Sequence, residues 1–172
     1  MKIAIIGTGN LGLSIAKGLI INNTYTDLYL TKRNLESIRE FEEYKSVFLT
    51  TDNKEAVKNA DILIFAVQPS QFESILEEIK PHLNEKHVVI STITGFAISR
   101  IEDVISKSYP IVRAMPNTAI SVGKSMTCLC HNKEGESKLP IAEAIFNGLG
   151  TSLPIEEHLM QAATVLCASG IA

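Results

Sequence analysis

Six residues near the start of the chain, Gly7-Thr8-Gly9-Asn10-Leu11-Gly12, have the spacing G-x-G-x-x-G and directly follow the apolar run Ile3-Ala4-Ile5-Ile6. In such a turn the first glycine permits a tight bend, and the second lets the backbone approach a pyrophosphate. The third lets the following helix pack close to the strand. Free backbone N–H groups and the dipole at the helix start then attract the phosphates. In this position the pattern predicts a dinucleotide-binding site.

The residues that follow the second predicted strand bear on which dinucleotide is bound. That strand runs from Leu28 to Thr31, and Lys32 and Arg33 come next, with no acidic residue before Glu36. Sites for NAD usually carry an Asp or Glu here, which binds the ribose hydroxyls and would repel a 2′-phosphate. Arginine can instead bind that phosphate with paired hydrogen bonds. The pattern favours NADP(H) over NAD(H), the alternative being that both cations belong to a solvated turn.

These motifs must be positioned by a sheet, and the chain supplies alternating apolar runs and amphipathic stretches of helical length. The alternation predicts an α/β fold, a Rossmann-type doubly wound, mostly parallel sheet with helices on both faces. Strands are expected at residues 2–6, 28–31, 47–49, 61–67, 87–91, 111–114 and 125–130. Helices are expected at residues 10–21, 34–44, 69–79 and 140–149, with a short one capped by Asp52 or Asn53 and another starting at residue 156.

Composition excludes several other classes of function. The chain has 172 residues, 45% hydrophobic and 20% charged, which suits one ordinary soluble domain. A net charge of -3 and few aromatic residues argue against binding to nucleic acid. No apolar run could span a membrane, and the run before Gly7 is too short for a signal peptide. A cytoplasmic location without membrane association is therefore expected.

No cluster of metal ligands or catalytic triad is evident. The segment Cys128-Leu129-Cys130-His131 lacks the usual zinc-ligand spacing and has no second pair nearby, so alternating strand residues are expected there and no metal site. The histidines, which are His82, His87, His131 and His158, belong to no motif and are expected at the surface. The catalytic residues therefore remain unknown at this level.

Several segments, taken in order, resemble the pyrroline-5-carboxylate reductase family along nearly the whole chain. They are GTGNLG, TKRN, ADILIFAVQP, VISTITG, VRAMPNTAISVG and MQAATVLCASGIA. The resemblance implies NADPH-dependent reduction of 1-pyrroline-5-carboxylate to L-proline, a step of proline biosynthesis, with the cyclic imine as substrate. It divides the chain into a dinucleotide-binding domain at residues 1–155 and the start of a truncated helical dimerisation domain at 156–172. The longer protein would form a homo-oligomer through that second domain.

The resemblance also carries site residues onto this sequence. It assigns cofactor binding to Ile6, Gly7, Thr8, Gly9, Asn10, Leu11, Gly12, Thr31, Lys32, Arg33, Asn53, Ala66, Val67, Gln68, Pro69, Thr94 and Gly95. It assigns substrate binding to Asn117, Thr164, Ser169 and Gly170. Asn53 could equally be only a helix cap, and Met115-Pro116-Asn117 could be only a rigid turn.

The chain departs from the family pattern at three places. Gln68 replaces a lysine, Ala119 replaces the second proline of MPNTP, and the segment 167–172 lacks a serine, a glycine and a proline of SGSGPA. These changes leave two alternatives open. One is another NADP-linked reductase, such as an F420-dependent NADP reductase or a hydroxyacid dehydrogenase. The other is a sensor that binds NADP without turnover, which Gln68 and the altered segment favour.

Overall fold

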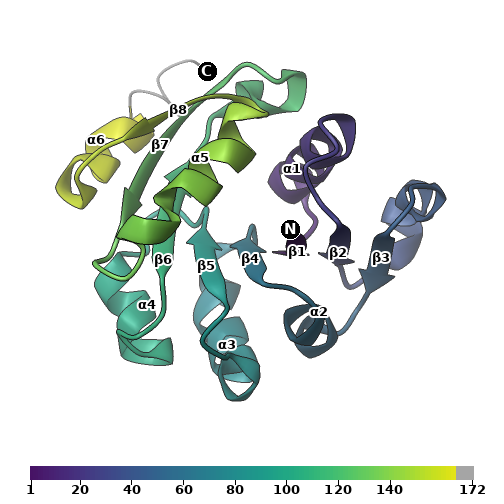
Figure 1. Ribbon diagram of the computed structural model, residues 1–172, viewed down its shortest axis with the longest axis horizontal. Helices are drawn as coiled ribbons and strands as arrows, with labels where there is room; N and C mark the ends of the chain where they lie inside the picture. The colour runs from purple at the N-terminus through teal and green to yellow at the C-terminus, as the bar shows by residue number, and fades with distance from the viewer. Residues whose placement is uncertain (166–172) are drawn as a thin grey trace.

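The computed structural model describes residues 1–165 and contains one eight-stranded sheet with the strand order β3-β2-β1-β4-β5-β6-β7-β8 (Figure 1). The strands are β1 (Lys2–Ile6), β2 (Asp27–Thr31), β3 (Val47–Thr50), β4 (Ile62–Phe65), β5 (Val88–Ser91), β6 (Ile111–Met115), β7 (Ser125–His131) and β8 (Gly150–Pro154). Neighbouring strands from β3 to β6 are parallel, β7 is antiparallel to β6, and β8 is parallel to β7. The expected mostly parallel sheet is confirmed.

The central strands are buried on both faces, which explains their continuous apolar sequences. Every residue of β4 and β5 is buried, because helices cover both sides of a doubly wound sheet. One face packs against α2 (Asn53–Asn59), α3 (Pro69–Ile79), α4 (Ile98–Ile105) and α6 (Met160–Ala163). The other packs against α1 (Asn10–Ile21), the 3-10 helices η1 (Leu35–Glu43) and η3 (Thr118–Val122), and α5 (Leu139–Asn147).

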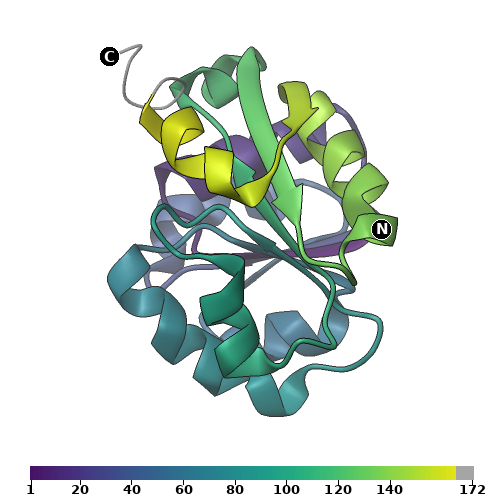
Figure 2. The same ribbon diagram turned by 90° about the vertical axis from the view of Figure 1, so that its left-hand side faces the viewer.

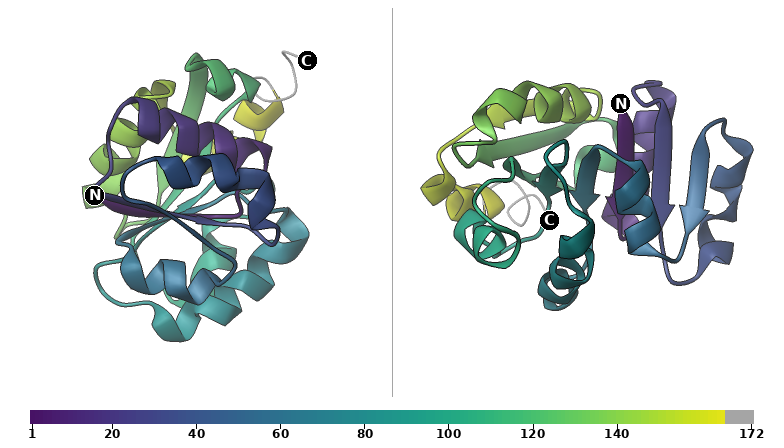
Figure 3. Two further views of the ribbon diagram at one scale, coloured as in Figure 1. Left: turned by 90° about the vertical axis from the view of Figure 1, so that its right-hand side faces the viewer. Right: turned by 60° about the horizontal axis from the view of Figure 1, so that its bottom comes forward.

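Figures 2 and 3 show this layering from two opposite sides. In Figure 2 the teal helices α3 and α4 lie below the sheet. The left panel of Figure 3 shows the purple helix α1 on one side of the sheet and α2 on the opposite side. Short 3-10 turns at Lys80–His82, Glu136–Lys138 and Glu157–Leu159 complete the elements. The two helical layers therefore cover the central strands on both faces.

Most of the predicted elements are present, and α1 and α3 have the predicted bounds. The helix expected at residues 34–44 is wrong in type, because residues 35–43 form a 3-10 helix that Asn34 caps by accepting from the Glu36 N–H. Helix α4 and strand β8 were not predicted, and neither was the 3-10 helix η3. Helix α4 is only 8 residues long, and strand β8 consists of partly exposed residues at the sheet edge, so neither has a strong periodic signal.

The strand order reverses beside β1, and this reversal determines where a ligand can bind. Strands β2 and β3 follow on one side of β1, and β4 then pairs with β1 on its other side. The connections after β1 and β4 therefore diverge to opposite sides of the sheet. In open α/β sheets the crevice at the carboxyl ends of such strands is where ligands bind.

Candidate dinucleotide-binding site

A cleft of about 580 Å³ lies at the carboxyl ends of the strands on either side of this reversal. The glycine turn after β1, the turn after β2, the start of α2 and the segment from β4 into α3 contribute its walls. The lining residues are Gly7, Thr8, Gly9, Thr31, Lys32, Arg33, Asn34, Thr51, Asn53, Ala66, Val67, Gln68, Gln71, Ser74 and Ile75. Tertiary structure thus brings together ten of the predicted cofactor residues, from four separate segments.

The three glycines of the loop have three different structural roles. Gly7 has a φ of +91°, which side-chain-bearing residues rarely adopt. A Cβ on Gly12 would lie 2.3 Å from the Gly7 carbonyl oxygen, so this glycine lets α1 approach the end of β1. These two predicted roles are confirmed. A Cβ on Gly9 would have no atom within 4 Å, and the residue lies open beside the cleft, where a phosphate could approach the backbone.

The residues between these glycines are fixed to the end of β2. The Gly7 N–H donates to the Thr31 hydroxyl at 3.1 Å, and the Thr8 hydroxyl donates to the Thr31 carbonyl oxygen at 2.8 Å. The Thr8 backbone N–H donates to the same carbonyl at 2.9 Å. Thr8 and Thr31 are buried. The loop is therefore held in place by protein groups alone.

The turn after β2 presents a positive edge to the cleft. Lys32 is half-buried and Arg33 is exposed, and neither forms an ion pair with any residue in the described range 1–165. Among the described lining residues there is no carboxylate. This wall suits a phosphate and offers no acid for a ribose diol.

The structure separates the two interpretations of Asn53. The residue that caps α2 is Asp52, whose carboxylate accepts from the Lys54 N–H at 2.8 Å. Asn53 is the first helical residue, and its amide donates to Glu78 at 3.5 Å at the cleft margin. Asn53 is therefore not the helix cap.

Sequence reasoning missed the wall that α3 contributes. Gln71, Ser74 and Ile75 line the cleft, and their spacing of three and four residues places them on one face of the helix. Because this spacing directly follows Gln68, which was predicted to bind the cofactor, it could have indicated that one face of the helix lines the same site. Asn34 and Thr51 also line the cleft and were not predicted.

Some predicted cofactor residues lie outside this cleft. Ile6 is fully buried in the core beneath the loop, and Gly12 packs against Gly7. Pro69 is exposed as the first residue of α3, while Thr94 and Gly95 are exposed after β5. The Thr94 hydroxyl contacts the Met115 sulfur at 3.9 Å.

A second cleft, of about 390 Å³, lies between the start of α1 and the segment after β6. It is lined by Asn10, Leu11, Ser14, Pro116, Asn117, Ile120 and Ser121, none of which is ionisable. Asn117 also caps η3, since its side-chain oxygen accepts from the Ala119 N–H at 3.2 Å. The structure thus brings Asn117, predicted for substrate, beside Asn10 and Leu11, predicted for cofactor.

The remaining predicted substrate residues lie in the last segment. The Thr164 hydroxyl donates to the Met160 carbonyl at 2.8 Å within its own helix, and the residue lines neither cleft. Ser169 and Gly170 lie outside the described residues.

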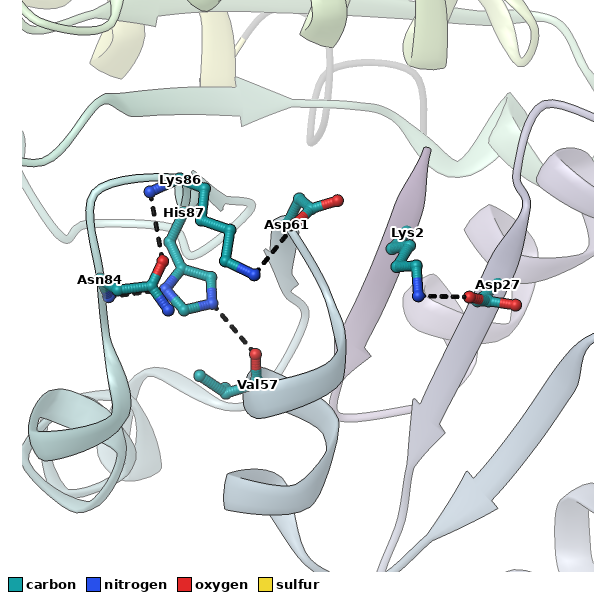
Figure 4. Close-up of polar contacts among 7 residues, drawn as sticks. All are labelled: Lys2, Asp27, Val57, Asp61, Asn84, Lys86 and His87. Carbon is teal, nitrogen blue, oxygen red and sulfur yellow. Dashed lines mark hydrogen bonds and ion pairs between the residues drawn. The ribbon is translucent and has the colours of Figure 1, made fainter.

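The prediction that all histidines lie at the surface is wrong for His87. This side chain is fully buried, its Nδ1 accepts from the Asn84 N–H at 2.9 Å, and its Nε2 lies 3.0 Å from the Val57 carbonyl (Figure 4). Those contacts fit the tautomer with hydrogen on Nε2 and give the ring a structural role.

Lys2 and Asp27 form an ion pair at 3.0 Å, and the hydrogen bond and the negative charge of Asp27 raise the pKa of Lys2 (Figure 4).

Residues 1–165 contain no group of three or more His, Cys, Asp or Glu side chains arranged to hold a metal ion. No helix in the same range is long and apolar enough to cross a membrane.

Strand order, the glycine turn and the cleft at the switch point define a Rossmann-type doubly wound fold with a candidate dinucleotide site. Residues 2–95, more than half of the chain, match the family described as NADP oxidoreductase, coenzyme F420-dependent. The chain belongs to this family.

Several proteins similar to this chain are named pyrroline-5-carboxylate reductase or pyrroline carboxylate reductase. The chain is 40% identical to pyrroline-5-carboxylate reductase 1 of Dictyostelium discoideum, over 99% of this chain and 33% of that protein. A pyrroline-5-carboxylate reductase structure from Coxiella burnetii aligns with a TM-score of 0.92 at 34% identity, over 99% of this chain and 64% of the other. The Plasmodium falciparum pyrroline carboxylate reductase with NADP bound aligns with a TM-score of 0.87 at 27% identity, over 99% and 63%. The chain therefore spans less than two thirds of each of these proteins.

Proposed function

We propose that this chain is the cofactor-binding part of an NADPH-dependent reductase that converts 1-pyrroline-5-carboxylate to L-proline. The observation that carries the proposal is the cleft in which an open glycine loop faces a turn bearing Lys32 and Arg33. The similarity to proteins named pyrroline-5-carboxylate reductase, including one with NADP bound, supports the choice of substrate and cofactor.

The cleft has the features that NADP(H) requires. The space beside Gly9 would admit the pyrophosphate, and the first N–H groups of α1 would donate to it. Lys32 and Arg33 would bind the 2′-phosphate, and the α3 face with Gln71, Ser74 and Ile75 would lie against the adenosine half. The assignment of Asn53, Ala66, Val67 and Gln68 to the cofactor rests on their place in the same wall.

The second cleft is the proposed place for the reacting end. Bound NADPH supplies a hydride, and the protein supplies orientation and electrostatics. Asn10, Leu11 and Asn117 would hold the ring and the imine in surroundings that contain no ionisable side chain among the described lining residues. These side chains would orient the imine rather than protonate it, because none of them is a general acid.

Residues 1–155 are then the proposed dinucleotide-binding domain, and residues 156–172 are the proposed start of the helical part. The longer length of the similar reductases supports this division. Thr164, Ser169 and Gly170 are then proposed to lie toward the substrate, and pairing of helical parts would produce a homo-oligomer.

Calorimetry with NADPH and NADH tests the cofactor assignment, and tighter binding of NADPH is expected. Arg33→Asp should weaken NADPH binding by about 1.5–3 kcal/mol, the scale of a charged hydrogen bond, and leave NADH binding nearly unchanged. Arg39→Asp is the matched control, because Arg39 is exposed on η1 and pairs with Glu36 away from the cleft. Equal affinities for NADPH and NADH would refute the preference.

Oxidation of NADPH in the presence of 1-pyrroline-5-carboxylate, with proline identified as the product, tests the reaction. Because the family description names coenzyme F420, the same assay is run with F420 in place of the imine. Turnover with F420 alone would replace the proposed substrate. Because the chain is proposed to be the cofactor-binding part alone, it should bind NADPH without turnover; binding without turnover of either compound by a longer protein that contains this chain would favour a sensor.

A further inference from the structure

Thr31 ends β2 and contacts the glycine loop through both its side chain and its backbone. Its hydroxyl accepts from the Gly7 N–H at 3.1 Å, and its carbonyl oxygen accepts from the N–H and the hydroxyl of Thr8 at 2.9 and 2.8 Å. The side chain is only 3% exposed, so these bonds are shielded from water. The first part of the loop thus has a dedicated partner 24 residues away in the sequence.

The loop is confined from the opposite side as well. A Cβ on Gly7 would lie 2.3 Å from a methyl carbon of Val67, so Gly7 fits closely between Thr31 and the segment after β4. The Gly7 N–H, already bonded to Thr31, is not free to bind a phosphate. Binding therefore depends on Gly9 and the residues after it, whose position is set by how Gly7 and Thr8 are held.

The cation turn has a different anchor. Although Lys32 directly follows Thr31, its N–H donates to the Thr50 carbonyl oxygen of β3 at 3.2 Å. The neighbouring η1 starts at the Asn34 cap, which is independent of Thr31. Loss of the Thr31 hydroxyl should therefore disturb the pyrophosphate part of the site and spare the part that would bind a 2′-phosphate.

We propose that the Thr31 hydroxyl is a positioning group that holds the glycine loop in its phosphate-binding conformation before any ligand arrives. This inference rests on the proposed function, since it assigns the loop to the pyrophosphate of a dinucleotide. A preformed loop avoids the ordering cost of binding. Valine at this position has a similar shape but cannot accept the Gly7 hydrogen bond, which would leave a partly buried N–H unpaired.

The test compares Thr31→Val with Thr31→Ser by titration with three ligands. NADH reports on the glycine loop alone, 2′-AMP reports on the cation turn alone, and NADPH reports on both. Thr31→Val should weaken NADPH and NADH by the same factor, about 5- to 30-fold, and leave 2′-AMP unchanged. Thr31→Ser, which keeps the hydroxyl, should restore both affinities.

Thr127→Val is the matched control, because Thr127 is a fully buried threonine of β7 that bonds to Ser125 and lines neither cleft. It should leave all three affinities unchanged. If Thr31→Val does not fold, Thr31→Ala is compared with Thr31→Ser, and retained 2′-AMP binding shows that the protein is folded.

The possible outcomes separate the inference from the function on which it rests. Unchanged dinucleotide affinity in Thr31→Val, or an equal loss of 2′-AMP affinity, would overturn the positioning role while leaving the proposed function intact. Failure of the unaltered protein to bind either NADPH or NADH would overturn the proposed function itself.

Discussion

The glycines at positions 9 and 12 should respond in opposite ways to the addition of a side chain. Gly9 has φ and ψ of -80° and -161°, an extended conformation that any residue can adopt, and a Cβ there meets nothing within 4 Å. Gly12 lies inside α1, and its Cβ would be 2.3 Å from the Gly7 carbonyl oxygen and 3.3 Å from a methyl of Ile5. A side chain at position 9 would therefore extend into the space of the proposed ligand, whereas a side chain at position 12 would collide with Gly7 and Ile5.

These distances set the expected magnitudes. Gly9→Val should lower the free energy of unfolding by only about 1 kcal/mol, because valine is a poorer residue than glycine at the N-cap of α1. It should nevertheless abolish dinucleotide binding, because the valine methyls would occupy the proposed pyrophosphate space. Gly12→Ala should destabilise the fold by about 1–3 kcal/mol, because the closest obstacle is backbone and cannot rotate away.

Both variants are measured by chemical denaturation, followed by calorimetric titration with NADPH. Gly123→Ala is a reference for a glycine with positive φ and open space, at a position that lines neither cleft. Retained NADPH affinity in Gly9→Val would show that the loop is only a structural turn. A fully stable Gly12→Ala would contradict the close approach of α1 to β1.

Three further predictions concern the rest of the domain. Burial raises the pKa of the Cys130 thiol to about 12, so this thiol should react with iodoacetamide at pH 8 only after unfolding. Protein stability should fall as pH rises from about 9 toward 12, because the unfolded thiol ionises first. Peptide mapping locates the label, and rapid labelling of Cys130 itself in the native protein would contradict this. Asn132→Ala should destabilise the fold by about 2–4 kcal/mol in urea titrations, because the side-chain amide of Asn132 forms hydrogen bonds of 3.0 Å or less with Ile111, Gly135, Glu102 and Tyr109. A loss as small as that of the exposed control Asn59→Ala would refute this. Ser106→Gly should raise stability by up to about 1 kcal/mol, since Ser106 has a φ of 118°, and a lower melting temperature would show that the position is not strained.

The fold was largely predictable because its signals are local and repeated. The apolar run at residues 61–67 could only be a buried strand, and Pro69 with its amphipathic continuation defined α3. The 3-10 character of residues 35–43 was not predictable, because periodicity alone does not distinguish a 3-10 helix from an α-helix over so short a stretch. Strand β8 was not predicted, because its stability comes from pairing with β7 rather than from its own sequence.

The candidate site likewise has features that the sequence predicts and contacts that only the tertiary structure decides. The sequence by itself determined the chemistry: a G-x-G-x-x-G turn after a strand and two cations after the next, since both depend on residue type and short spacing. Only the tertiary structure decided which residues meet, because the parallel register places the ends of β1, β2 and β4 at one edge of the sheet. It brought the α3 face into the cleft and separated Asn53 from the helix cap. It also gave Thr31 a role in holding the loop, because a hydrogen bond between residues 24 positions apart has no signal in either local sequence.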